Sequence, residues 1–166
     1  LSRQMEGLAG QRYRAALRWS PQFPSTDPLL LNSLGYFLAD RGTTKQDFEL
    51  AAQLTGHAVE ILQQTVADNT KMGIYSQRWL NETRQQQAIT QDSYAWALYK
   101  LKRFDEAETA QRQVLADAKS SGIKDDSTLA ELWFHLAKIL QAQGKTAEAN
   151  EAIKEAQRLQ PDIQKM

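Results

Sequence analysis

Cysteine is missing from the 166-residue chain. Without a thiol the chain forms no disulfide, no thiolate zinc site and no cysteine nucleophile. Because cysteine-free chains occur both inside and outside cells, this absence leaves the compartment open.

An excess of charge of either sign is missing as well. Twenty Lys and Arg residues balance twenty Asp and Glu residues, and the basic residues are scattered along the rows. Surfaces that bind nucleic acid gather their basic side chains into a patch or stripe. Nucleic acid is therefore not expected as a partner.

Long apolar runs are also missing. The most apolar run, residues 129–140, is interrupted by Glu131, His135 and Lys138 and is far too short to span a bilayer. Leu1 is not followed by the basic and apolar pattern of a signal peptide, so we interpret the sequence as a mature or excised fragment.

Catalytic and metal-binding motifs are absent too. The rows contain no Gly-x-Ser-x-Gly elbow, phosphate-binding glycine-rich loop or His-Glu-x-x-His motif. His57 with Glu60, and Glu131 with His135, are close enough on a helix to share a face, but di-iron bundles need a duplicated Glu-x-x-His motif. We interpret both as helix-surface pairs and expect no cofactor, no metal and no enzyme; a helical metal protein or enzyme is the least favoured alternative.

Proline is scarce and is confined to Pro21, Pro24, Pro28 and Pro161. The long proline-free tracts are rich in Ala, Leu, Gln, Glu and Lys, which favour helix. This pattern predicts an all-α fold without strands.

The C-terminal part has apolar residues at spacings of three and four, as on amphipathic helices: Leu129, Leu132, Trp133, Leu136, Leu140, then Ala149, Ile153 and Ala156. Gly144 in the short corner is expected to take a left-handed conformation, and Pro161 stops the second helix. Two helices joined so tightly pack antiparallel.

The same plan occurs twice earlier in the chain. Around residues 92–110, Tyr94 and Leu98 lie on a first helix and Ala107 on a second, with KRFD as the corner. An earlier copy starts with Asp27 as a helix cap followed by Pro28, and Thr43 or Thr44 is expected to cap its second helix, which carries Phe48, Ala51 and Ala58.

These segments resemble tetratricopeptide repeats, helical hairpins of about 34 residues with Trp, Leu, Gly, Tyr, Ala, an aromatic, Ala and Pro at fixed offsets. The last copy matches at Trp133, Leu136, Ala137, Leu140, Gly144, Ala149, Ile153, Ala156 and Pro161, whereas the middle copy has Gln91 and Lys102 where the family prefers Trp and Gly. The LGYFLADR stretch is similar to bacterial members with irregular, extended repeats, and by analogy it favours the periplasm or envelope over the cytoplasm.

The resemblance implies a single domain over residues 1–166, a right-handed α-solenoid of antiparallel helix hairpins. We expect about three repeats, at 28–62, 88–118 and 129–161, an orphan capping helix at 4–19 and an insertion at 65–90. Ile74, Tyr75, Trp79 and Leu80 make the insertion too apolar for a solvated linker, so it is predicted to be packed and partly helical.

In this family the stacked hairpins form a concave face that binds peptide segments. The resemblance places the first helix of each hairpin on that face, with the candidate lining Asn32, Tyr36, Asp40, Asp92, Trp96, Tyr99, Lys100, Glu131, Phe134 and Lys138. Large stiff aromatics are enriched at binding hot spots, so Tyr36, Trp96, Tyr99 and Phe134 are the predicted anchors, although such residues also pack against the next repeat.

The leading hypothesis is a non-catalytic module that binds a partner peptide or protein in this aromatic groove. Some family members hold a terminal carboxylate with Lys and Asn in one repeat and Lys and Arg in a later one. Here those places are Asn32 and Tyr36, then Glu131 and His135, so a mixed or internal peptide is expected instead. The alternative is a scaffold that self-associates through its uncapped solenoid ends.

Overall fold

The computed structural model describes residues 27–163, except the side chains of Ser120 and Ser121. Within this part the chain forms six α-helices and no β-strand, which confirms the all-α prediction. The orphan helix expected at residues 4–19 lies outside the described residues.

The first hairpin consists of α2 (Pro28–Arg41) and α3 (Lys45–Met72). As predicted, Asp27 caps α2, and its carboxylate accepts the backbone N–H of Leu29 at 3.0 Å. Of the two candidate threonines, Thr44 caps α3 and forms a capping box with Asp47. Both helix starts therefore arise from local side-chain chemistry.

Helix α4 (Gln77–Lys100) and helix α5 (Phe104–Ser121) form the second hairpin, and α6 (Asp126–Ala142) and α7 (Thr146–Leu159) form the third. Residues 65–90, the expected insertion, comprise the end of α3, the connection at 73–76 and the first part of α4. Leu80 is buried there, whereas Ile74 and Tyr75 are exposed, so only part of this apolar set is packed.

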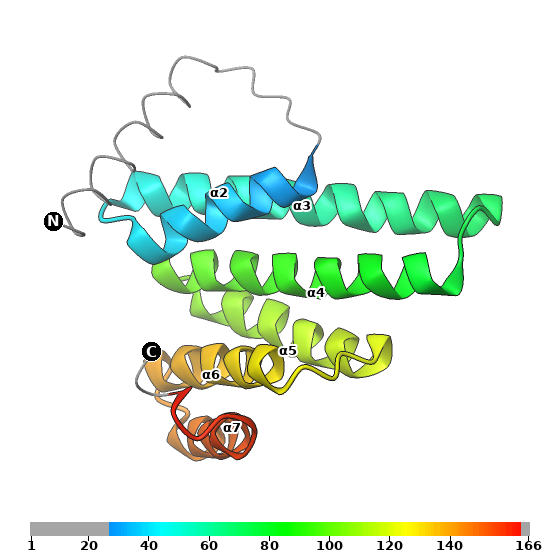
Figure 1. Ribbon diagram of the computed structural model, residues 1–166. Helices are drawn as coiled ribbons and strands as arrows, with labels where there is room; N and C mark the ends of the chain where they lie inside the picture. Colours follow the sequence, from blue (N-terminus) through cyan, green and yellow to red (C-terminus); the bar gives the residue numbers. More distant parts are fainter. Residues whose placement is uncertain (1–26, 164–166) are drawn as a thin grey trace, which may run out of the picture.

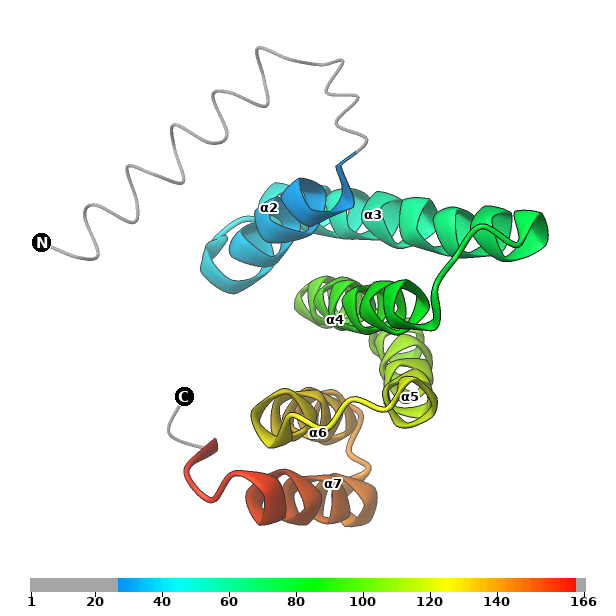
Figure 2. The same ribbon diagram turned by 45° about the vertical axis from the view of Figure 1, so that its right-hand side comes forward.

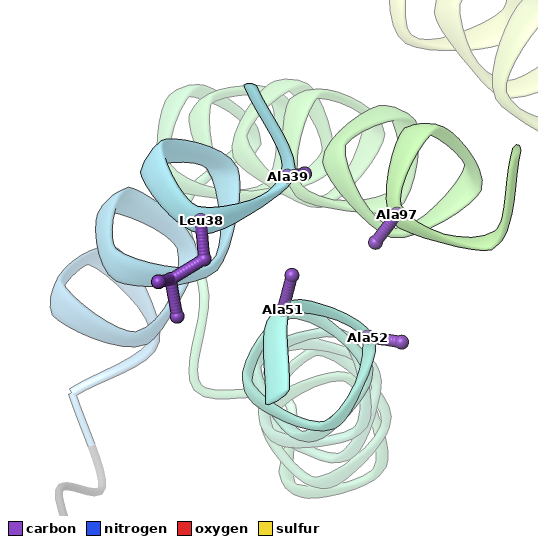
Figure 3. Close-up of a cluster of buried hydrophobic side chains, with 5 residues drawn as sticks. All are labelled: Leu38, Ala39, Ala51, Ala52 and Ala97. Atoms are coloured by element: carbon purple, nitrogen blue, oxygen red, sulfur yellow. The ribbon is translucent and has the colours of Figure 1, made fainter. Parts of the chain in front are cut away.

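The core is a series of small clusters rather than one central core. Five residues join α2 and α3 to α4: Leu38, Ala39, Ala51, Ala52 and Ala97 (Figure 3). Farther along, Leu98, Ala107 and Ile139 connect α4, α5 and α6. Alanine at these crossings lets the helix backbones approach closely, and both of these clusters tie one hairpin to the next, as in repeat proteins.

The hairpins follow one another in layers, with α2 and α3 first and α6 and α7 last (Figure 1). Helix α4 packs against both α2 and α6, whereas the backbones of α3 and α5, like those of α5 and α7, lie farther apart, and α5 reaches α7 through side chains such as the Arg112–Glu148 ion pair. Because the first helices touch and the second helices spread apart, the stack curves with α2, α4 and α6 on its inner side (Figure 2). This sequential packing confirms a helical repeat solenoid.

None of the helices within residues 27–163 combines the length and the apolarity required for crossing a membrane.

Candidate functional site

The inner face is the surface that α2, α4 and α6 present on the inner side of the stack. The candidate lining residues belong to these three helices, and most of them are half-buried; Asp40 is exposed and Asp92 is buried. A half-buried side chain has one part held by the protein and another part open to a partner, which suits a preformed binding surface.

A buried polar cluster lies beneath this face and joins three helices. Asp92 of α4, Gln111 of α5 and His135 of α6 are 6%, 0% and 5% exposed. His135 Nδ1 lies 3.0 Å from both carboxylate oxygens of Asp92, and Gln111 Nε2 donates to Asp92 Oδ1 at 2.7 Å. The same Gln111 nitrogen donates to the backbone oxygen of Leu132 at 3.0 Å, so the second hairpin is joined to the third by directional bonds.

The charge of this cluster depends on His135. Burial by itself lowers the pKa of His135, but the carboxylate of Asp92, its hydrogen bond, and the more distant Glu131 and Asp40 outweigh burial. The pKa of His135 is consequently raised above its usual value. When His135 is protonated, its imidazole pairs with Asp92, and a buried charge that is paired and hydrogen-bonded is tolerated.

Aromatic rings cover the cluster on the inner face. The ring of Trp96 stacks on His135 with centroids 4.3 Å apart, and Tyr99 stacks on Trp96 at 4.7 Å. The Nζ atom of Lys100 lies 5.3 Å from the Trp96 ring and 5.9 Å from the Phe48 ring, which are cation–π distances. Trp96 therefore packs against the next repeat while one part of it remains accessible.

Tyr36 brings α2 to α6 across α4. Its hydroxyl donates to Glu131 Oε1 at 3.4 Å. Burial, followed by the nearby carboxylates of Glu131, Asp40 and Asp92, raises the pKa of Tyr36 to about 12. The phenol stays neutral at physiological pH and remains a hydrogen-bond donor on an electronegative part of the inner face.

Phe134 and Lys138 form the α6 edge of the inner face. Lys138 Nζ lies 5.0 Å from the centre of the Phe134 ring, and that ring is tilted against His135 at 6.5 Å. On α2, the buried side-chain oxygen Oδ1 of Asn32 has no hydrogen-bond partner among the described residues. The face thus combines aromatic surface and charges of both signs.

The structure brings nine of the ten predicted residues into the contacts and electrostatic interactions described above, and it leaves Asn32 apart from them. Sequence reasoning missed the Asp92–Gln111–His135 cluster. The prediction that His135 forms a helix-surface pair with Glu131 was wrong, because His135 is buried and its partner is Asp92 of the preceding hairpin. A usable signal was an Asp and a His at neighbouring places of consecutive repeats.

The other histidine behaves as expected. His57 Nδ1 lies 3.6 Å from Glu60 Oε2, one helical turn away on the exposed surface of α3. In the part of the chain that the structure describes, no three His, Asp or Glu side chains are grouped so that they could hold a metal ion.

The outward surface of α7 bears on the self-association hypothesis. Its exposed side chains include Glu148, Asn150, Glu151 and Lys154. Beyond α7, Ile163 folds back and is buried against Ala130 and Ala156. The exposed side chains of α7 are largely polar, and self-association through the ends of the stack stays a prediction.

Comparison with protein families gives a match to the C-terminal part of the chain. The tetratricopeptide repeat family matches residues 130–163, which form α6, α7 and the turn after them. This confirms that the chain carries a tetratricopeptide repeat, in the segment with the fullest set of family residues. No curated protein sequence matches the chain.

Proposed function

We propose that this chain, which carries a tetratricopeptide repeat, is a non-catalytic interaction module whose inner face binds an extended peptide segment of a partner protein. Proteins of this family typically act as non-catalytic interaction modules. The supporting observation is that half-buried aromatic and charged side chains from α2, α4 and α6 meet on one face above a buried polar cluster.

The proposed anchors differ in what else they do. Trp96 is held between His135, Tyr99 and Lys100, so it helps to support the face as well as to form it. Phe134 lies at the edge with Lys138 over its ring, and a peptide side chain could displace that lysine. Phe134 also packs against the buried residues Ala130, Ala156 and Ile163, so a thermal melt of Phe134→Ala accompanies the binding measurement.

The partner's chemistry follows from the neighbours of these rings. Asp40 and Glu131 lie on one part of the face, whereas Lys100 and Lys138 lie beside aromatic rings. A peptide with one apolar side chain flanked by charges of both signs fits this arrangement. Affinity is expected to be on the order of micromolar for a short segment.

The test uses peptides selected from a random phage-displayed library against the wild-type chain. Phe134→Ala should weaken binding of a selected peptide roughly thirtyfold, the loss typical of a hot-spot residue. A matched pair of changes on the outward surface of α7, Glu151→Ala and Lys154→Ala, should leave binding unchanged. Equal binding to Phe134→Ala and wild type, measured by calorimetry, would refute the inner face as the binding surface.

Trp96 needs a graded comparison. Trp96→Phe keeps a ring on His135, whereas Trp96→Ala removes it and also exposes the buried pair beneath. We expect Trp96→Ala to abolish peptide binding and Trp96→Phe to retain part of it, with thermal melts recorded on both to separate lost binding from lost structure.

A further inference from the structure

The connection between α3 and α4 concentrates exposed apolar side chains. Met72, Ile74 and Tyr75 are 59%, 66% and 41% exposed. The other large apolar residues exposed within residues 27–163 are Leu29, Leu30 and Ile89, which belong to other elements. We call residues 72–76, which connect the first hairpin to the second, the α3–α4 tip.

The tip is ordered by its own backbone hydrogen bonds. Gly73 ends α3 in a left-handed conformation with φ 66°, and its N–H bonds to Thr70 O while that of Ile74 bonds to Asn69 O. Ser76 then caps α4 by accepting from the N–H of Trp79 at 3.1 Å. With its polar backbone groups paired in this way, the turn presents apolar side chains from a defined framework.

The tip also projects from the molecule. α3 and α4 run side by side beyond the ends of the later helices, and their connection lies at the far end (Figure 1). Apart from Gly73 and its two neighbours in the chain, no residue has a heavy atom within 4 Å of a Cβ placed on Gly73, so the surroundings of the turn are open. A flat surface could approach the tip without meeting the rest of the stack.

Basic side chains bracket the tip. Between Lys71 and Arg78 the sequence contains no acidic residue, and both cations are exposed. Arg78 is paired with Glu82 one turn farther along α4, away from the turn. Apolar side chains at an apex with cations behind them match the layering of an anionic lipid surface, in which phosphates lie above the acyl chains.

We propose that the α3–α4 tip docks into the interface of an anionic lipid bilayer. Met72 and Ile74 enter the acyl boundary, Tyr75 lies at the headgroup level that tyrosine prefers, and Lys71 and Arg78 contact phosphates. A protein partner is less well matched, because a stable interface needs about 800 Å² from each side and three side chains on a convex apex supply far less. This proposal is independent of peptide binding on the inner face.

Flotation with lipid vesicles tests the proposal. Vesicles of phosphatidylcholine containing about one third phosphatidylglycerol should carry the wild-type chain, and pure phosphatidylcholine vesicles should carry much less. Changing Met72→Ser and Ile74→Ser together should lower the partition coefficient at least roughly tenfold, since apolar burial supplies the anchoring. Raised salt should weaken binding because phosphate contacts are screened.

The chain offers a matched control. Leu29→Ser with Leu30→Ser removes two exposed leucines, at 53% and 42%, from the start of α2. This variant should float as wild type does. Equal loss in the control and the tip variant would overturn the assignment to the tip, as would a wild-type chain that fails to float with anionic vesicles or that self-associates through the tip in sedimentation.

Site-specific labelling keeps the test decisive if a serine variant folds poorly. Because the chain has no cysteine, Gln77→Cys beside the tip and Asn150→Cys on α7 each provide one attachment point for an environment-sensitive fluorophore. Anionic vesicles should shift the emission to the blue at position 77 and leave position 150 unchanged. A shift at both positions, or at neither, would contradict insertion of the tip.

Discussion

The second and third hairpins have the same architecture but are held together by different chemistry. In α6 and α7 the helices meet through Leu136, Ala137, Leu140, Ala149 and Ala152, a cluster of apolar side chains. In α4 and α5 the contact also buries Asp92 and Gln111, which bond to α6. Apolar packing tolerates small shifts, whereas paired polar groups fix one register. The hydrogen bonds of Asp92 and Gln111 to α6 therefore determine how the second hairpin is positioned on the third.

Removal of the Asp92 carboxylate should have the largest effect on the free energy of unfolding. Asp92→Ala leaves His135 buried without its partner, and breaking a buried pair typically costs about 3–5 kcal/mol of unfolding free energy. Urea unfolding measures the loss. Glu151→Ala, an exposed carboxylate on α7, should change the free energy by less than about 0.5 kcal/mol.

The double substitution sharpens this comparison. Asp92→Leu together with His135→Leu converts the polar contact into one like that of the third hairpin. Because well-packed apolar residues often replace a buried pair at no cost, the double variant should be more stable than Asp92→Ala. A double variant as unstable as the single one would show that packing, and not the unpaired charge, dominates.

The next test concerns Gly35 of the first hairpin, which occupies the place of Ala95 and Ala137 in the later hairpins. Gly35 lies so close to α3 that an added Cβ would be 2.4 Å from Thr55 Cγ2 and 3.0 Å from the backbone oxygen of Ala51. Gly35→Ala should therefore destabilise by about 1–3 kcal/mol, the cost of overpacking. A rise in stability, as expected for an exposed helical glycine, would show that α2 and α3 have room to separate.

The features that sequence predicted well depend on short-range chemistry. The cap at Asp27, the cap at Thr44 and the left-handed Gly144 each follow from a few adjacent residues, and the structure confirms all three. The apolar spacing in turn predicted which helices pair as hairpins, because neighbouring helices with short connections must pack together.

The features that it missed depend on how the hairpins stack. Asp92 and His135 meet because of the rotation between successive hairpins, and no local pattern encodes that angle. Ile74 and Tyr75 are apolar, as packed residues are, yet both are exposed in the connection between α3 and α4, which lies beyond the ends of the later helices (Figure 1). The inner-face residues stay a prediction as a binding site, since their positions follow from the repeat and their partner does not.

A pH series tests the charged state of the polar contact, with a smaller expected effect because both partners stay in place. A raised pKa in the folded state means that His135 contributes stability that is fully present below about pH 6.5, the value in the unfolded chain, and is lost as pH rises through the folded value. Unfolding free energies between neutral and mildly alkaline pH should therefore decline.

His57→Gln makes this measurement specific, because the chain has two histidines and the variant leaves His135 alone. In an NMR titration of this variant, the pKa of the His135 imidazole should lie above its usual value. A midpoint at or below about 6.5 would mean that burial outweighs Asp92, and the decline in stability would then be absent.

The smallest expected effects compare the corners of the two hairpins. Lys102 and Gly144 occupy equivalent places, and both have a left-handed backbone, with φ 61° and 77°. A side chain in this conformation costs about 1–2 kcal/mol, and glycine avoids most of that strain. Lys102→Gly should accordingly stabilise the chain by roughly 1 kcal/mol, and Gly144→Ala should destabilise it by a similar amount. Changes of opposite sign in the melting temperatures of the two variants would show that the corners have equivalent backbones and differ only in the residue. A loss of stability in Lys102→Gly would instead mean that the lysine side chain makes a stabilising contact at its corner.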